Sequence, residues 1–351
     1  MKDGTRCESN LVSRLPRALR AGDLVGIFAP SLPASAWYPE RFRYGIEGLK
    51  RSLGVEVYIP SQATEEGGFT SGSAKERAQV FRELVCDSRI KAIFTTLGGF
   101  NSAEILEHVV EDELRRNLKI LIGYSDATSL LIGVHALAGW CTFYGPAAMT
   151  QFGEFPTPHA FTVANLRRVL MSVTEVGELE DPPEWTNEFL DWGTSAWCSR
   201  ARTMVSPAER SVWRSGYGRG VLFGGNLETL NLILGTPFVV VPSEIVLFWE
   251  VTDAEAYLPR VQRALTQLRQ AGIFDRTRAM LIGRSPDAAS YRGVSLKDVV
   301  LEAAADFSFP IVADLPFGHT DPMVTIPIGV PCEVAAEATR SSIAVRSSGV
   351  C

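Results

Sequence analysis

The most constraining feature of this sequence is the regular alternation of short apolar runs with helical patterns between residues 23 and 139. The apolar runs include "DLVGIFAPS", "IKAIFTTLGG" and "LKILIGYS", and the helical patterns include "YPERFRYGIEGLKRSLG" and "SAKERAQVFRELVCD". Strands that alternate with helices form parallel sheets with helices on both faces. We therefore predict an α/β protein whose N-terminal domain is built on a Rossmann- or flavodoxin-like parallel sheet.

The pattern changes after residue 155. A segment rich in Pro, Trp, Ser and Arg follows, and beyond it β-rich runs such as "SEIVLFWEV" and "PIVADLPFG" mix with amphipathic helices. We expect an N-terminal α/β domain over 1–155, a crossing segment with a substrate-binding loop over 156–218, and a C-terminal α+β domain over 219–351. The C-terminal domain is expected to contain a small curved sheet of the swivelling β-barrel-like kind.

Composition and charge exclude several partners and compartments. With 34 Lys and Arg against 40 Asp and Glu, the chain lacks the positive charge that a nucleic-acid partner requires. Its apolar runs are too short to span a membrane, and its N-terminus lacks the apolar stretch of an export signal, so we expect a cytoplasmic protein. The six cysteines, Cys7 among them, show no paired spacing, which argues against a zinc site and a disulfide framework.

The stretch "LIGYSDATSLL" (121–131) places Ser125 between an apolar strand and a helix. Two interpretations are open. Ser and Asp commonly begin helices, so Ser125 can be a capping residue. Alternatively, a sharp strand-to-helix turn exposes the Ser125 hydroxyl as a nucleophile. The turn would lie at the carboxyl end of the strand, where open parallel sheets bind ligands.

A serine nucleophile needs a base, and the base needs an orienting carboxylate. Of the four histidines, His319 in "DLPFGHTDP" follows an apolar strand in a loop that Gly318 and Pro322 constrain. Glu250 ends the apolar strand "IVLFWE" and is costly to bury without a partner. Each residue also has an ordinary interpretation, as a structural loop histidine and a surface glutamate.

Acyl transfer also needs donors for the oxyanion of the tetrahedral intermediate. The "TTLGGFNS" turn offers the backbone N–H groups of Gly98 and Gly99, and the N–H of Asp126 follows the predicted nucleophile. The order Ser, Glu, His is that of the α/β-hydrolases. However, Ala127 replaces the second glycine of their G-x-S-x-G motif, which weakens that interpretation.

The motifs "GGFNS", "GYSDAT", "GGNLETL", "LFWE" and "FGHTDPMVTIPIG" together resemble the LD-carboxypeptidase family of serine peptidases. The similarity runs from "GDLVGIFAPS" to "TIPIG" and is greater to the microcin C self-immunity branch than to the murein-recycling branch. The resemblance implies that Ser125 is the nucleophile, Glu250 the triad acid and His319 the base. It also implies that the oxyanion donors are the amides of Asp126 and of Gly98 or Gly99.

In the immunity branch, an insertion helps to bind a nucleotide-like leaving group, and a tryptophan stacks on the base. Here Trp185 and Trp192 are the candidates, although both can equally be hydrophobic plugs between domains. Asn226 matches a position that lines the cleft, with a turn residue as its alternative. Asn101 and Ser102 complete the predicted substrate-binding set. Three further residues of the insertion have no assignable role: Trp197, Arg200 and Arg202.

The resemblance implies a cytoplasmic homodimer without cofactor or metal that acts on a small peptide-nucleotide or peptide substrate. The function it favours is hydrolysis at the carboxyl side of an aminoacyl or peptidyl group in adenylate-like antibiotics, which confers self-immunity. Two alternatives stay open. One is a murein tetrapeptide LD-carboxypeptidase, and the other is a protein that binds a nucleotide analogue without turnover.

Overall fold

The computed structural model describes residues 13–206, 209–286, 288 and 290–351; Cys7 lies outside the described residues. The first of two sheets has six strands in the order β12-β5-β4-β3-β1-β2, and every pairing is parallel except that of β12 with β5. Its strands are β1 (Leu24–Phe28), β2 (Glu56–Tyr58), β3 (Ile90–Thr95), β4 (Ile120–Gly123), β5 (Thr142–Tyr144) and β12 (Ile326–Ile328). The predicted flavodoxin-like sheet is confirmed, because 2-1-3-4-5 is the order of that fold.

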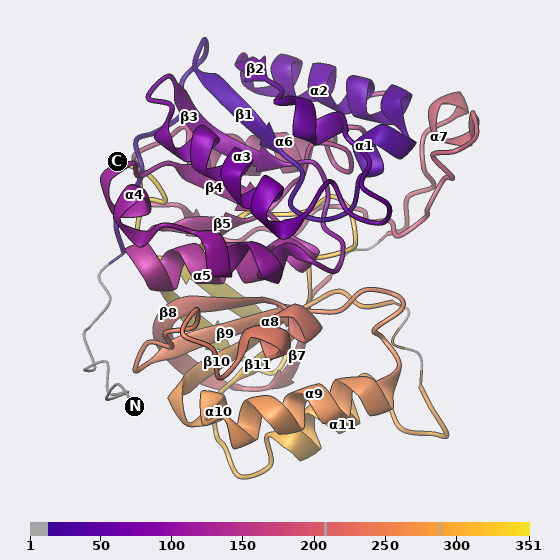
Figure 1. Cartoon of the computed structure of the whole chain (residues 1–351). Coiled ribbons are helices and arrows are strands. Elements are labelled where there is room, and N and C mark those ends of the chain that lie inside the picture. Colours follow the sequence, from indigo (N-terminus) through magenta and orange to yellow (C-terminus); the bar gives the residue numbers. More distant parts are fainter. Residues whose placement is uncertain (1–12, 207–208, 287, 289) are drawn as a thin grey trace.

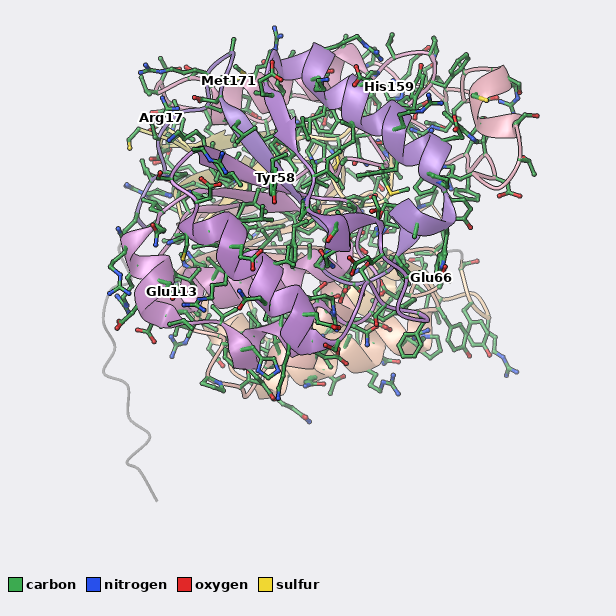
Figure 2. The ribbon with its side chains drawn as sticks, turned by 45° about the horizontal axis from the view of Figure 1, so that its top comes forward. Arg17, Tyr58, Glu66, Glu113, His159 and Met171 are labelled. Carbon is green, nitrogen blue, oxygen red and sulfur yellow. The ribbon has the colours of Figure 1, made fainter. Side chains whose placement is uncertain are left out.

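Helices cover both faces of the first sheet, as predicted. In Figure 1, α2 and α6 lie on one side of it and α3, α4 and α5 on the other. Figure 2 shows the same half from above, with Tyr58 at the end of β2 and Glu113 on α4. The bounds are α2 (Pro39–Leu53), α3 (Ala74–Cys86), α4 (Glu111–Arg116), α5 (Thr128–Ala138) and α6 (Ala160–Leu170).

The second sheet is larger than the sequence suggested. Its eight strands have the open order β6-β14-β13-β8-β9-β10-β11-β7, with β8 to β11 parallel at the centre. The extra strands β6 (Gly177–Glu178) and β7 (Ser211–Arg214) come from the expected crossing segment. The others are β8 (Gly216–Asn226), β9 (Ile245–Glu250), β10 (Thr277–Gly283), β11 (Ile311–Leu315), β13 (Pro331–Ala336) and β14 (Ser341–Val345).

Four helices belong to the second half: α8 (Leu227–Ile233), α9 (Leu258–Gln270), α10 (Ile273–Arg276) and α11 (Leu296–Ala303). In Figure 1, α9, α10 and α11 lie below the second sheet, and α5 and α8 pack where the halves meet. Both central strands β4 and β9 are buried at every position, which explains why they form unbroken apolar runs rather than alternating patterns.

The two sheets are joined by more than the crossing segment. After β11 of the second sheet, the chain passes through the loop that contains His319 and returns to the first sheet as β12, antiparallel to β5. Short elements complete the fold: α1 (Ala34–Trp37), η1 (Ser61–Thr64), η2 (Ser102–His108), η3 (Ser125–Ala127) and α7 (Ala196–Ser199). The segment with α7 projects at the right of Figure 1.

The described residues lack three features: a membrane-spanning helix, a metal-binding cluster and a disulfide bond. No helix in this part of the chain is long and apolar enough to cross a membrane. No group of three or more His, Cys, Asp and Glu side chains within the same residues could hold a metal ion. The five described cysteines are all free, and Cys141 and Cys332 are buried.

Candidate active site

Ser125 lies at a sharp turn between β4 and α5. Its φ is +61°, in the left-handed region that a side chain with a Cβ rarely adopts. Such a strained strand–turn–helix segment exposes a serine hydroxyl at the end of a sheet. The register of β4 and β5 pairs Gly123 with Tyr144, and the backbone N–H of Ser125 donates a hydrogen bond to the Tyr144 hydroxyl at 3.2 Å.

The three residues predicted to form a triad lie in one hydrogen-bonded chain. The Nε2 atom of His319 lies 3.2 Å from Oγ of Ser125, and its Nδ1 atom lies 2.6 Å from Oε2 of Glu250. If Nδ1 carries the proton and donates to Glu250, then Nε2 can accept the hydroxyl proton of Ser125. The residues come from the ends of β4 and β9 and from the loop after β11, so the topology brings strand ends from both sheets together.

Glu250 is completely buried at the end of β9. Its Oε1 atom accepts hydrogen bonds from the Tyr144 hydroxyl at 2.6 Å and from Nδ2 of Asn226 at 3.3 Å. Asn226 reaches it because the register of β8 and β9 pairs these two residues. Burial would raise the pKa of Glu250, but the charge of His319 and these hydrogen bonds outweigh burial and hold the pKa below its usual range.

His319 is partly accessible, with 25% of its side chain exposed. Burial favours its neutral form, but the nearby carboxylates, Glu250 above all, raise the pKa of His319 above its ordinary value of 6.5. Gly318 makes the close approach to Glu250 possible. It has a φ of +97°, and a Cβ there would lie 2.6 Å from Cγ of Glu250.

The glycine turn after β3 lies directly against Ser125. A Cβ on Gly98 would lie 3.1 Å from Cβ of Ser125 and 3.2 Å from the backbone nitrogen of Asp126. No acceptor is found for the N–H groups of Gly98 and Gly99 within the described part of the chain. The predicted oxyanion donors are therefore near the predicted nucleophile, and a side chain at the Gly98 position would crowd Ser125.

Asn101 and Ser102 help to shape this turn and do not line the cleft described below. Their backbone N–H groups donate to Oδ2 of Asp126 at 3.1 and 3.0 Å, and the buried Ser102 hydroxyl donates to the same atom at 2.6 Å. The Asp126 carboxylate thus anchors the Gly98–Ser102 segment. The sequence predicted a role only for the Asp126 backbone and missed this function of its side chain.

A cleft of about 720 Å³ opens between the two halves and includes Ser125 and His319 in its wall. At its catalytic end lie Gly98, Gly99 and the 252–255 segment. Of the predicted tryptophans, Trp192 lines the cleft and Trp185 does not. Trp185 lies instead under the guanidinium of Arg284, whose Cζ is 5.1 Å from the ring centroid.

Asn226 also lies outside the cleft wall. It is buried, and its amide nitrogen donates to Glu255 at 2.7 Å as well as to Glu250. Its side-chain oxygen accepts from the Thr229 N–H at 2.9 Å and caps α8. The residue therefore orients the candidate triad acid rather than facing a ligand.

The other end of the cleft is aromatic. Phe189 belongs to this end, 6.0 Å from Trp192 between ring centroids, and is 71% exposed, which is unusual for phenylalanine. Phe100 also lines the cleft and is 78% exposed, but it directly follows Gly99 of the catalytic end. Trp197, to which the sequence assigned no role, is also in this wall. Cζ of Arg41 lies 4.8 Å from the Trp192 ring centroid and 5.2 Å from that of Trp197.

Arg202 links the insertion to the loop after β11 that contains His319. Its Nη2 atom lies 2.7 Å from carboxylate oxygens of both Glu154 and Asp321, and all three side chains are largely buried. Asp321 follows His319 by two residues, and its backbone pairs with that of Thr186 in the insertion. Arg200, by contrast, forms an exposed ion pair with Glu188.

Residues 25–145 match the family model of the LD-carboxypeptidase N-terminal domain, and residues 219–334 match that of the LD-carboxypeptidase C-terminal domain. The chain belongs to the LD-carboxypeptidase family. Membership indicates a peptidase or related hydrolase. The insertion lies wholly between the matched regions, in residues 146–218, which neither family model covers.

Several relatives of this LD-carboxypeptidase family member match it over nearly their whole length. A Vibrio cholerae protein that carries a provisional carboxypeptidase name is 34% identical over 90% of this chain and 92% of its own. The microcin C7 self-immunity protein MccF of Escherichia coli is 31% identical, covering 94% of this chain and 95% of the relative. A Bacillus subtilis protein named "Probable murein peptide carboxypeptidase" is 28% identical over 95% of both chains.

The structure of MccF in its ligand-free state superimposes on this family member with a TM-score of 0.87 and 29% identity, covering 96% of this chain and 100% of MccF. Other structures of MccF contain aspartyl sulfamoyl adenosine or glutamyl sulfamoyl guanosine. The shared fold thus binds aminoacyl nucleoside analogues in that relative.

Proposed function

We propose that the protein is a serine hydrolase in which Ser125 is the nucleophile, His319 the base and Glu250 the acid that orients it. The observation that carries the proposal is the hydrogen-bonded chain from Ser125 through His319 to Glu250, at 3.2 and 2.6 Å. The glycine turn beside Ser125 supports it, because backbone N–H groups are the usual donors to a tetrahedral oxyanion. Nucleophile, base and oxyanion donors are the parts that acyl transfer requires.

In this mechanism Nε2 of His319 takes the hydroxyl proton as Oγ of Ser125 attacks the carbonyl carbon. The oxyanion accepts hydrogen bonds from the backbone N–H groups of Asp126 and of Gly98 or Gly99. His319 then gives its proton to the leaving nitrogen, the carbon–nitrogen bond breaks, and an acyl-enzyme remains. A water molecule, deprotonated by His319, releases the acyl group and restores Ser125.

The proposed substrate is an aminoacyl or peptidyl group joined through an amide-type bond to a nucleotide-like leaving group. The aromatic side chains of the cleft wall support this choice, since exposed rings such as Phe189 and Phe100 can stack on a nucleobase. The ligands of MccF named above are of the same chemical class. Destroying such compounds in the cytoplasm would protect the aminoacyl-tRNA synthetases whose aminoacyl-adenylate intermediates they mimic, which is a self-immunity function. Assembly as a homodimer stays a prediction from the family resemblance.

A murein tetrapeptide carboxypeptidase is the second candidate, and one feature of the cleft favours it. Asp253 and Glu255 lie in the wall near His319 and raise its pKa by their charge, so this end suits the ammonium group of a diamino acid. The proposed catalytic residues are the same for both substrates. The two substrates differ in the leaving group, a nucleotide-like group or D-alanine, and in the acyl group, which carries the diamino acid in the murein peptide.

The experiment is a mass-spectrometric hydrolysis assay on aminoacyl and peptidyl sulfamoyl adenosines beside a murein tetrapeptide, with the native protein and Ser125→Ala in parallel. We expect the native protein to release sulfamoyl adenosine and Ser125→Ala to be at least about 1,000-fold slower. Release of D-alanine alone would move the function to cell-wall recycling. Tight binding without product would indicate a binding protein, and equal rates for both proteins would refute the catalytic assignment.

A further inference from the structure

Arg41, the third residue of α2, is a charged side chain held in an unusual place. It is only 6% exposed, yet it belongs to the wall of the cleft. Its Nε and Nη2 atoms donate to the backbone carbonyls of Met149 and Thr150 at 2.9 and 3.1 Å. Two indole rings lie near its guanidinium, as described above, so its orientation is fixed by contacts on several sides.

This buried cation has no direct anionic partner. Among the described residues no carboxylate lies within ion-pair distance of Arg41. The two acids whose charges act on it, Glu154 and Asp321, both form ion pairs with Arg202 instead. Burial lowers the pKa of Arg41 to about 10, although the more distant charge of Glu154 opposes this effect. The cationic form is therefore less stable here than in water.

One edge of the guanidinium remains for a ligand. The backbone carbonyls of Met149 and Thr150 occupy Nε and Nη2, and the guanidinium carbon lies over two indole rings. Its Nη1 atom makes no hydrogen bond to any described residue. A partly desolvated guanidinium binds oxyanions strongly and with defined geometry. A buried charge without a partner is costly, and a ligand anion would remove that cost.

We propose that Arg41 is the receptor for a negatively charged oxygen group on the substrate's leaving group. The proposal rests on the hydrolase function above and adds a charge requirement to it. The shared chemistry is an oxyanion, which is the phosphate of a nucleotide in one candidate substrate and the terminal carboxylate of a peptide in the other. The aromatic walls of the same end bind the rest of the leaving group.

A purely structural role predicts a different result. In that case Arg41 only ties α2 to residues 149–150 and to the indoles, and its loss would weaken every ligand equally or lower stability. An anion receptor instead changes the affinity for charged ligands relative to matched neutral ones. The decisive quantity is therefore a ratio of two dissociation constants, which cancels general damage to the cleft.

The experiment measures binding of AMP and adenosine by calorimetry to the native protein, Arg41→Gln and Arg41→Lys. A second arm compares a peptide ending in D-alanine with its C-terminal amide and so distinguishes the two sources of the anion. Arg43→Gln is the matched control, since Arg43 is exposed on the same helix and pairs with Glu40. The melting temperature of each variant reports on folding.

We expect the native protein to bind the anionic member of one pair about 10- to 100-fold more tightly than the neutral member. This ratio should fall close to one in Arg41→Gln, remain partly in Arg41→Lys and be unchanged in Arg43→Gln. If the native protein bound the anionic and the neutral ligand equally well in both arms, that result alone would overturn the proposal. The proposal would also be overturned if folded Arg41→Gln kept the native ratio of the two dissociation constants. Because no turnover is needed, failure here is separate from failure of the hydrolase assignment.

Discussion

The catalytic end and the aromatic end of the cleft are built in different ways. At the catalytic end, Ser125, Tyr144, Asn226 and Glu250 stand at or next to the ends of paired strands, and most of their polar atoms bond to one another. At the aromatic end, Phe189 lies in an irregular stretch and is mostly exposed, and Trp197 lies in the one-turn helix α7 of the same insertion. Strand ends thus position Ser125 and Glu250, whereas side chains of the insertion form the surface proposed for the leaving group.

This difference predicts a separation of kinetic effects. Groups locked by strand register should control the rate of the bond-breaking step, because small displacements there change the transition state. Aromatic groups on the insertion should control affinity in the ground state and the transition state alike, which changes KM more than kcat. The variants below test this separation, beginning with the largest expected effect.

Glu250→Gln should lower kcat by about 1,000- to 10,000-fold, because an amide in place of the carboxylate favours the wrong tautomer of His319 and does not stabilise its charged form. The measurement is steady-state kinetics on the sulfamoyl adenosine substrate. Glu244→Gln is the control, since Glu244 lies just before β9, is exposed and pairs with Arg278. A loss of less than tenfold would mean that Glu250 does not orient the base.

Gly98→Ala should lower kcat by about 100- to 1,000-fold, the cost of disturbing one oxyanion donor. The added Cβ would lie 3.2 Å from both Oγ of Ser125 and the backbone nitrogen of Asp126. Gly193→Ala serves for comparison, because its Cβ would meet no backbone atom within 4 Å. Unchanged kcat with normal melting would remove Gly98 from the oxyanion site.

Phe189→Ala should raise KM by about 5- to 150-fold with little change in kcat, since stacking of a base on an aromatic ring contributes about 1–3 kcal/mol. The matched control is Phe69→Ala, which removes a phenylalanine that is 70% exposed but lies outside the cleft wall. A fall in kcat as large as the rise in KM would contradict the predicted separation of kinetic effects between the two ends of the cleft. No effect on KM would exclude Phe189 from leaving-group binding.

The smallest expected effect concerns pH. His319 must be neutral to accept the Ser125 proton, and its pKa is raised above 6.5, so kcat/KM should fall as pH decreases through a value above 6.5. Glu255 also raises the pKa of His319 by its charge. Glu255→Gln should therefore move the acid limb to lower pH by about one unit or less. A shift to higher pH would contradict this electrostatic arrangement.

The sequence predicted the catalytic end better than the aromatic end, for a physical reason. Apolar strands followed by polar loops mark Ser125, Glu250 and His319 as strand-end residues. However, β4 and β9 belong to different sheets, and only the structure shows that their ends meet. Tyr144 was missed because it is one of three residues of a short apolar strand, and only the register with β4 reveals its role. Arg41 sits in an ordinary amphipathic helix, and its burial depends on packing that no local pattern encodes.

The second sheet shows the same limit. Its central strands were visible as apolar runs, but β6 has only two residues and joins the sheet through β14, far away in the sequence. The choice between Trp185 and Trp192 also depended on the path of the insertion. Both tryptophans are equally good candidates by residue type, and only tertiary contacts separate them.

The position of β12 has a consequence for the order in which the enzyme can mature during its synthesis. The first sheet keeps an open edge at β5 until residue 328 has left the ribosome, and His319 emerges only shortly before. Exposed strand edges are prone to pair with other chains. Until this segment emerges, a nascent chain therefore has neither a closed sheet nor the proposed base, and both are acquired together.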